Sequence, residues 1–244
     1  MRRLAAESLS VPADTLAQSL LGCTLVRKLS DGTRLAGVIV ETEAYLGAID
    51  KAAHSKGARR TPRTEPMFGP GGTAYVFLIY GMHYCFNVAA STAGDPQAVL
   101  IRAIEPTEGS RTMRDVRAKT SKAANPGTLP DHLLCSGPAR LCQAMDIDRR
   151  FSGIDLTVSE DIWIEPRSRS GDSGEPDIGM SVRIGVDYAE EWAAAELRYF
   201  VKGSRSISGP KALSRSSPAL DCRGGPADGP ISGVPRRGAG SSKR

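Results

Sequence analysis

The stretch Tyr75-Val-Phe-Leu-Ile-Tyr-Gly-Met-His-Tyr-Cys-Phe-Asn87 places alternating aromatic and β-branched residues on either side of a Tyr-Gly-Met centre. This pattern predicts two short antiparallel strands joined by a tight turn. Gly81 suits a two-residue turn whose first position is glycine, because that position needs a positive φ. Tyr80 and Met82 put large apolar side chains where turns usually carry Asn, Asp or Ser. The tip is therefore either buried under another segment or held out to touch a partner.

The composition around this hairpin is that of a soluble globular protein. The chain has 244 residues, of which 40% are hydrophobic, and no apolar run approaches the ~20 residues of a membrane span. The first ten residues lack the apolar segment of a secretory signal. Five cysteines without a Cys-x-x-Cys pair favour neither a disulfide framework nor a zinc ribbon. We expect a cytoplasmic monomer that needs no cofactor or metal.

The net charge of +5 is concentrated at the C-terminal end. Eight basic and two acidic residues lie from Ser204 onward, which gives this segment +6 and leaves −1 for the rest. Residues 204–244 consist mainly of Ser, Gly, Pro, Arg and Ala, so they bury too little apolar surface to offset the cost of ordering. We predict a folded domain over residues 1–203 and a disordered basic tail over 204–244.

The residues before the hairpin predict a helix and two strands. Residues 12–21 begin with Pro and Asp and end at Gly22, as short helices do. Residues 23–29 and 33–45 are strands separated by an Asp-Gly turn. In the second strand a period of two puts residues 39, 41, 43 and 45 on one face and residues 38, 40, 42 and 44 on the other. A long basic connection, residues 46–72, then leads to the hairpin.

Strands and helices also alternate after the hairpin. Residues 97–105 predict a strand that carries Arg102, and residues 107–122 a basic helix. Ser136-Gly137-Pro138 opens a helix over 139–145; its free amides either bind a phosphate or simply mark a capped helix. Further strands are expected over 155–159, 162–165, 181–186 and 197–202. This order lacks βαβ regularity and predicts an α+β domain with a mainly antiparallel sheet.

Seven motifs, found in order, closely resemble the alkyladenine (3-methyladenine) DNA glycosylase family. They are Glu-Thr-Glu-Ala-Tyr-Leu-Gly (41–47), Ala-Ala-His-Ser (52–55), Thr-Pro-Arg (61–63), Met-Phe (67–68), Tyr-Val-Phe-Leu-Ile-Tyr-Gly-Met (75–82), Leu-Ile-Arg-Ala-Ile-Glu-Pro (100–106) and Cys-Ser-Gly-Pro-Ala-Arg-Leu-Cys-Gln-Ala (135–144). The resemblance runs from about residue 10 to residue 203. It implies one domain in which helices surround a curved sheet with a protruding hairpin.

The resemblance also implies an activity in base-excision repair. Such an enzyme rotates an alkylated or deaminated purine out of double-stranded DNA and hydrolyses its N-glycosidic bond, leaving an abasic site. Glu43 matches the residue that activates the attacking water, and Arg102 matches one that helps to hold this water. One carboxylate can suffice, because a 3- or 7-alkylated purine already carries positive charge and leaves readily.

Four further residues match the family's base pocket. Tyr45 and His54 match residues that sandwich the flipped base, and Phe77 stands where the family often has Tyr. Phe77 keeps the stacking face and lacks the hydroxyl. Asn87 matches a residue that crowds the 2-amino group of guanine. Stacking on such side chains contributes about 1 to 3 kcal/mol per base.

The remaining matches concern the DNA duplex. Tyr80 matches the wedge that fills the gap left by the flipped base, and Met82 lies beside it. Contacts to the DNA backbone are expected from basic loop residues and from the helix start, namely Arg59, Arg60, Arg63, Ser136, Gly137 and Arg140. A solvated charged face is the commoner explanation for such basic runs.

Two other functions are compatible with parts of the sequence. A DNA or RNA binder without catalytic activity could use the aromatic hairpin as a stacking platform, but it would gain nothing from Glu43 beside a phosphate backbone. A metal hydrolase built on His54 lacks companion ligands at usable spacing. No Lys stands at the matched pocket positions, so we expect a monofunctional hydrolase that does not cut the strand.

Overall fold

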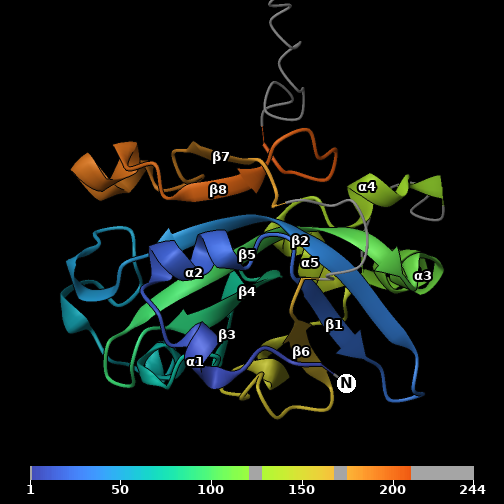
Figure 1. Ribbon diagram of the computed structural model, residues 1–244, viewed down its shortest axis with the longest axis horizontal. Coiled ribbons are helices and arrows are strands. Elements are labelled where there is room, and N and C mark those ends of the chain that lie inside the picture. Colours follow the sequence, from blue (N-terminus) through green and yellow to red (C-terminus); the bar gives the residue numbers. More distant parts are fainter. Residues whose placement is uncertain (1, 121–127, 168–174, 210–244) are drawn as a thin grey trace, which may run out of the picture.

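The computed structural model describes residues 2–120, 128–167 and 175–209, and it forms one α+β domain (Figure 1). The described strands make one strongly curled sheet in the order β3-β4-β5-β2-β1-β6, and β8 joins it by pairing with β2 and β7. The pairs are antiparallel. The strands are β1 (Thr24–Lys28), β2 (Arg34–Tyr45), β3 (Ala74–Ile79), β4 (His83–Ala90), β5 (Gln97–Glu108), β6 (Ile162–Glu165), β7 (Ile178–Ser181) and β8 (Arg198–Val201).

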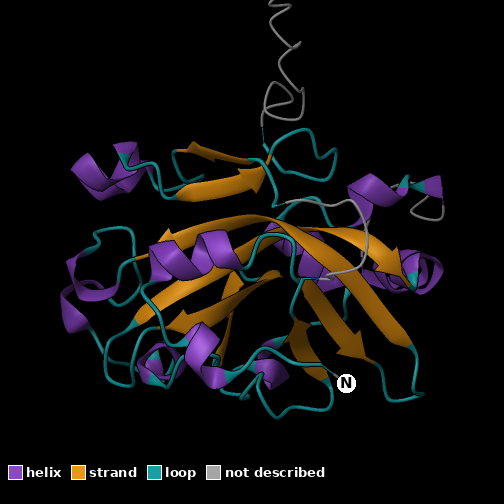
Figure 2. Ribbon diagram, viewed as in Figure 1, coloured by secondary structure: helices purple, strands orange, loops and turns teal. Residues whose placement is uncertain are grey.

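Helices surround this sheet (Figure 2). The α-helices are α1 (Ala6–Leu9), α2 (Ala13–Ser19), α3 (Ser110–Thr120), α4 (Asp131–Leu134) and α5 (Pro138–Ala144). Short 3-10 helices occupy the connections: η1 (Gly47–Ile49), η2 (Lys56–Ala58), η3 (Glu65–Phe68), η5 (Arg149–Phe151) and η6 (Asp187–Ala194). Among the described residues, no helix is long and apolar enough to cross a membrane. The predicted α+β class and curved sheet are confirmed.

Side chains alternate between two faces on the central strands. One face packs into the main core with α2 and α5, and it includes Ala74, Val76, Phe86, Val88, Val99 and Ile101. The other face lines a pocket and includes Tyr75, Phe77, Cys85, Asn87, Ala98 and Leu100. The period of two along β3, β4 and β5 therefore separates the residues that stabilise the fold from those that form a binding site.

Two irregularities in the pairing of β2 with β5 place Arg102. The register shifts between Ile39 and Glu41, and again between Glu41 and Thr42. The first shift leaves Val40 as an extra residue on β2, and the second leaves Arg102 as an extra residue on β5. Such bulges locally bend a strand and re-aim a side chain. Here the bulge accompanies the turning of Arg102 toward the carboxylates of β2.

The extra residue on β2, Val40, makes part of the predicted face pattern wrong. Residues 41, 43 and 45 share a face as expected, since Arg102 contacts both carboxylates and Tyr45 contacts Glu43. Ile39 instead belongs to the main core, whereas Val40 packs with Phe200 on the opposite side. A strict period of two cannot continue through a strand that contains an extra residue.

The hairpin tip is a tight turn closed by the amide of Met82, which donates to the carbonyl of Ile79 at 3.2 Å. Both central residues have positive φ, 52° at Tyr80 and 69° at Gly81. The expected glycine-first turn is therefore wrong: glycine occupies the second position, and a tyrosine adopts the left-handed conformation in the first. The side chains of Tyr80 and Met82 are 83% and 70% exposed, so no described segment buries the tip.

Several predicted boundaries also change. Of residues 155–159, Asp155 makes an isolated bridge with Thr73 and residues 156–158 form a turn, in which the Asp155 carboxylate accepts from the amide of Thr157 at 2.8 Å. The strand expected over 181–186 lies at 178–181 instead. β5 continues to Glu108, so α3 starts at Ser110, and residues 121–122 of that predicted helix lie outside the described residues. The strands expected at 162–165 and 197–202 are confirmed.

The first six residues of the predicted tail pack against the domain. Ser206 is buried, and Ile207 packs beside Phe200 in a small apolar cluster. Residues 210–244 lie outside the described residues. The predicted boundary at residue 203 therefore precedes the end of the packed chain, because a short polar-looking segment contains one apolar side chain that the sheet can cover.

Candidate active site

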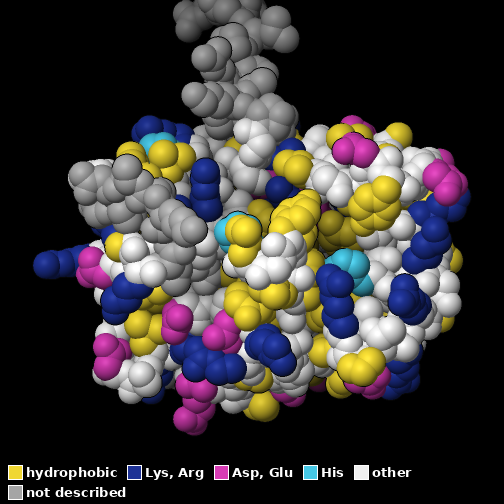
Figure 3. Space-filling model, turned by 180° about the vertical axis from the view of Figure 1, so that it is seen from behind, with side chains coloured by type: hydrophobic (Ala, Val, Ile, Leu, Met, Phe, Trp, Pro, Cys, Tyr) yellow, Lys and Arg dark blue, Asp and Glu magenta, His cyan; other side chains and the backbone are white. Residues whose placement is uncertain are grey.

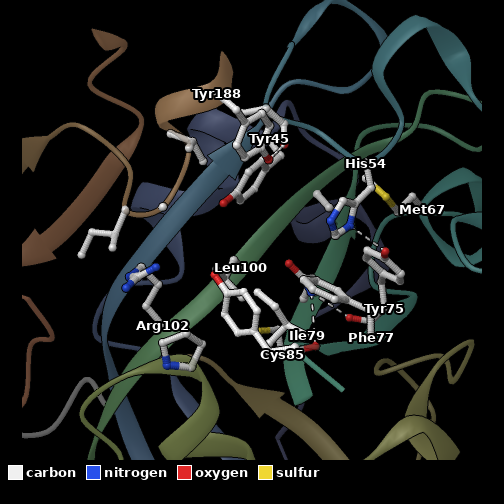
Figure 4. A pocket seen from close by; sticks show the side chains of 18 residues that line it. Tyr45, His54, Met67, Tyr75, Phe77, Ile79, Cys85, Leu100, Arg102 and Tyr188 are labelled. Carbon is white, nitrogen blue, oxygen red and sulfur yellow. Dashed lines mark hydrogen bonds between the residues drawn. The ribbon is translucent and has the colours of Figure 1, made fainter. Parts of the chain in front are cut away.

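A pocket of about 250 Å³ opens on the face of the sheet opposite the core. Hydrophobic and basic side chains gather around a hollow on this side of the molecule (Figure 3). Within the pocket, Tyr45 and Tyr188 lie on one side, and His54, Tyr75 and Phe77 lie on another (Figure 4). The pocket is thus an apolar, aromatic cavity with few polar groups, as small-molecule and base sites commonly are.

Two carboxylates and two guanidinium groups are buried beside this cavity. Glu41 and Glu43 are fully buried, and Arg102 and Arg198 are 6% and 2% exposed. Arg102 Nε donates to Glu41 Oε1 at 2.8 Å, and its Nη1 lies 3.1 Å from Glu43 Oε1. Although burial opposes its charged form, the Glu43 and Glu41 carboxylates raise the pKa of Arg102. Paired charges are the form in which buried ions are tolerated.

Glu43 is held by donors from three directions. The Ile184 amide donates to Oε1 at 2.8 Å, and the Tyr45 hydroxyl donates to Oε2 at 3.0 Å. Burial, followed by the charge of Glu43 and this hydrogen bond, raises the pKa of Tyr45 well above its usual value. Tyr45 therefore stays protonated and remains a donor. Among the described residues, Oε2 has the Tyr45 hydroxyl as its one donor, which leaves it acceptor capacity for a water molecule.

The walls beside Glu43 are joined by a second buried ion pair. The guanidinium of Arg183 donates to both oxygens of Asp50, at 2.5 and 3.0 Å, and neither side chain is exposed. Asp50 also accepts from the amides of Leu46 and Ala52. Arg183 lies 4.8 Å from the ring centroid of Tyr45. This pair fixes the loop after β2 to the segment that carries the Ile184 amide.

His54 belongs to an aromatic cluster on the other wall. Its ring centroid is 4.5 Å from that of Phe77, and its Nδ1 lies 2.9 Å from the Tyr75 hydroxyl. Arg63 Nη2, which can only donate, lies 3.4 Å from His54 Nε2. In the neutral ring Nε2 therefore accepts, and Nδ1 carries the proton and donates to Tyr75. Burial, assisted by the charge of Arg63, lowers the pKa of His54 to about 4.

The low pKa of His54 predicts a loss of stability in mild acid. Its pKa rises toward 6.5 on unfolding, so below that pH the unfolded chain takes up the proton first. The stabilisation is present above pH 6.5 and is lost as the pH falls toward 4. Between pH 7.5 and 5.0 we expect the unfolding free energy to lose about 1 to 2 kcal/mol through His54.

Denaturant unfolding of the wild type and of His54→Gln at both pH values measures this contribution. The variant lacks a titrating ring, so its loss between pH 7.5 and 5.0 should be smaller than that of the wild type. Equal losses in the two proteins would show that His54 titrates alike in the folded and unfolded states.

The remaining predicted residues lie in different settings. The Asn87 amide is buried and donates to the carbonyl of Tyr75 at 2.9 Å, which fixes its position in the pocket wall. Arg63 lies 5.0 Å from the ring centroid of Phe77, close to the pocket, whereas Arg60 is engaged with Glu65 at the surface. Exposed Arg59 lies in the same loop as these two arginines.

The other predicted backbone contacts lie at the start of α5. Ser136 is buried and its hydroxyl donates to the carbonyl of Ile207 at 3.2 Å. Gly137 precedes the helix with a φ of 119°, a conformation that favours glycine. Arg140 is exposed, and its Nη1 lies 3.4 Å from the carbonyl of Ser136.

Some lining residues were not predicted from the sequence. The period of two that places Phe77 in the pocket also places Tyr75 there, so the sequence did contain a signal for Tyr75. Ile184 and Tyr188 come from a loop and from η6, far along the chain, and no local pattern marks them. Among the described residues, no three His, Cys, Asp or Glu side chains lie close enough together to hold a metal ion.

Comparisons with known proteins agree on one family. A family model described as methylpurine-DNA glycosylase matches residues 7–205. The human protein named DNA-3-methyladenine glycosylase is 47% identical over 208 residues, covering 85% of this chain and 68% of its own length. The mouse protein of the same name is 48% identical, covering 84% of this chain and 61% of its own.

A bacterial relative is similar over almost its whole length. A protein of Desulfitobacterium hafniense (strain Y51), whose name contains the words 3-methyladenine DNA glycosylase, is 43% identical over 209 residues. The match covers 85% of this chain and 99% of the bacterial protein. The chain thus spans about two thirds of its mammalian relatives and nearly all of this bacterial one.

Proposed function

Because the chain belongs to the methylpurine-DNA glycosylase family, we propose that it is a DNA glycosylase that removes alkylated or deaminated purines from duplex DNA. The single observation that carries the proposal is the position of Glu43, a buried carboxylate that lies beside an aromatic pocket and contacts Arg102 at 3.1 Å. A simple nucleic-acid binder has no use for a buried carboxylate at this place.

In the proposed reaction, water attacks C1′ of the damaged nucleotide. Glu43 Oε2 takes the proton of this water, while Oε1 is held by the Ile184 amide and by Arg102. The bond between C1′ and the purine nitrogen breaks, and its electron pair leaves with the base. For a cationic alkylated purine, this neutralises the leaving group. The carboxylate also stabilises the positive charge that develops on the sugar.

The pocket would recognise the flipped base by stacking. Tyr45 lies on one side and the cluster of His54 and Phe77 on the other (Figure 4). Neutral His54 donates its one ring proton to Tyr75 and presents the rest of the ring as a surface. Electron-rich aromatic walls favour electron-poor, cationic purines. Asn87, fixed by its bond to the Tyr75 carbonyl, would limit the room for extra groups on the base edge.

Tyr80, at the exposed tip, would enter the duplex and fill the space of the flipped nucleotide. We expect Tyr80→Ala to weaken binding to a duplex with one damaged base by about 1 to 3 kcal/mol, the value of one stacked aromatic contact. The unfolding free energy should change by less than about 0.5 kcal/mol, because the side chain is 83% exposed. Fluorescence anisotropy and thermal unfolding measure the two quantities.

Val158→Ala is the matched control, because Val158 is a similarly exposed apolar side chain outside the hairpin. It should change neither quantity. If Tyr80→Ala lowered stability by several kcal/mol and left DNA binding intact, the tip would be a structural contact instead of a wedge.

Backbone contacts are proposed for the basic loop and for the start of α5. Arg59 and Arg63 are exposed in the loop that follows His54, and Arg140 is exposed on α5. Arg60 would have to exchange its ion pair with Glu65 for a phosphate. Ser136 and Gly137 would act through their main chain, because the Ser136 hydroxyl already donates to Ile207. Each phosphate neutralised steepens the salt dependence of binding by about 0.9 on a log–log plot.

The activity itself is tested with a panel of duplexes. Each contains one 3-methyladenine analogue, 7-methylguanine, hypoxanthine or ethenoadenine, and an undamaged duplex serves as control. Incubation with the protein followed by alkali should cleave the strand at one or more of the damaged positions and leave the undamaged duplex intact. No alkali-sensitive site in any duplex would refute the proposed function.

A further inference from the structure

Residues 204–209, called here the terminal strap, cross beside the buried charges of the site. The strap is attached at several points. Ile207 packs with Phe200, and its carbonyl accepts from the Ser136 hydroxyl at 3.2 Å. The Ser208 amide donates to Glu41 Oε2 at 2.6 Å, and the Ser208 carbonyl accepts from Arg198 Nη2 at 2.5 Å. The strap is thus fixed by main-chain and side-chain contacts.

The Ser208 hydroxyl bridges two charged groups. It donates to Glu41 Oε1 at 2.9 Å and accepts from Arg102 Nη2 at 3.1 Å. One hydroxyl provides one donor and two acceptor positions, so both bonds can exist together. The hydroxyl thus both donates and accepts a hydrogen bond, and an alanine side chain can do neither.

Glu41 is the other partner of this bridge, and its oxygens are already engaged. Oε1 lies within 2.7 to 2.9 Å of donors from Arg102, Arg198 and Ser208, and Oε2 accepts from the Ser208 amide. Glu41 is also fully buried. Because Glu41 is paired with both Arg102 and Arg198, it serves as a counter-ion to the two arginines.

These contacts fix the direction of Arg102. A guanidinium group is planar and rigid, so holding two of its nitrogens sets the direction of the third. Glu41 holds Nε and Ser208 holds Nη2, and together they aim Nη1 at Glu43, 3.1 Å away. We propose that Ser208 is a positioning residue, which orients Arg102 for its role beside Glu43. This inference rests on the function proposed above.

The test uses full-length Ser208→Ala, Ser208→Thr and Ser206→Ala. Release of 7-methylguanine from a duplex is followed in single turnover at saturating protein, and binding is measured with a duplex that carries a tetrahydrofuran abasic analogue, which cannot be hydrolysed. We expect Ser208→Ala to slow release about tenfold, because a small misalignment of catalytic groups slows the chemical step. Binding of the analogue should stay as in the wild type, and the melting temperature should fall by only a few degrees, as expected for the loss of hydrogen bonds to charged groups.

The other two variants test whether the effect depends on a hydroxyl at residue 208 in particular. Ser208→Thr keeps a hydroxyl and should restore most of the rate. Ser206→Ala makes the same substitution in the strap, but the buried Ser206 hydroxyl has no hydrogen-bond partner among the described residues, so its rate should equal that of the wild type.

Three results would overturn the inference. These are an unchanged rate in Ser208→Ala, an equal loss in Ser208→Thr, and a loss of analogue binding as large as the loss of rate. If the wild type itself released no base, the proposed function would fail instead, so the two failures are distinguishable.

Discussion

We expect Glu43→Gln to slow the release of a damaged purine by about 100- to 10,000-fold, the usual contribution of a general base. Gln has nearly the same shape, and its amide oxygen can still accept from the Ile184 amide, which now donates at 2.8 Å. It cannot accept a proton from water, and it cannot balance charge on the sugar. The loss should therefore appear in the single-turnover rate and spare DNA binding.

Glu160→Gln is the matched control, because Glu160 is exposed in the loop before β6. It should excise like the wild type. Circular dichroism of Glu43→Gln should show a folded protein, so that a lower rate reports on chemistry. Equal release by Glu43→Gln and the wild type would assign the base catalysis to another group.

Asp50→Asn should lower the unfolding free energy by about 3 to 5 kcal/mol, the usual cost of removing one partner of a buried ion pair. The Arg183 side chain, which is not exposed, would be left with an uncompensated charge. The amide also offers one accepting oxygen where two now accept from Leu46 and Ala52. Denaturant unfolding measures the effect. Because Arg183 precedes Ile184, we also expect weaker fixing of Glu43.

A neighbouring residue provides the control for this prediction. Lys51 pairs with Glu190 and Glu191 of η6 at the surface, where the two glutamates are 65% and 64% exposed. Lys51→Met should change the unfolding free energy by less than about 1 kcal/mol. The double variant Asp50→Asn/Arg183→Met should recover part of the loss, because it removes the unpaired charge. A small effect of Asp50→Asn alone would mean that water reaches Arg183.

The pocket face could be predicted where the strands are regular. The period of two that places Phe77 in the pocket also places Asn87 there across the hairpin, since Tyr75 pairs with Asn87. The face shared by residues 41, 43 and 45 followed from the same rule. The rarity of Tyr and Met in turns marked the tip as unusual but left it either buried or exposed. These features depend on local chain geometry, which the sequence encodes directly.

Other parts of the site depend on contacts between distant residues. The bulge that leaves Arg102 as an extra residue arises from the pairing of two strands about 60 residues apart in the chain. Neither the Ile184 amide nor Ser208 has a sequence signal, because each acts through its main chain or through one small hydroxyl. Their roles become visible once β7, β8 and the terminal strap are placed beside β2.

The hairpin has three parts in different surroundings: an exposed tip, a face in the core and a face in the pocket. Its tip exposes Tyr80 and Met82, its inner face contributes Val76 and Phe86 to the core, and its outer face lines the pocket. A segment of this kind can present an aromatic side chain without loosening the fold, because the core face holds it in place. This division of faces supports the base-flipping role proposed above.

The central claim is that the pocket releases a purine by attack of water, and product analysis tests it most directly. A duplex with one 7-methylguanine is incubated with the wild type in the presence and absence of borohydride, and the products are separated by chromatography. We expect free 7-methylguanine, a strand that stays intact until alkali is added, and no protein–DNA adduct, since none of the described residues lining the pocket is a lysine. A trapped covalent adduct, or a duplex that keeps its damaged base, would contradict the account.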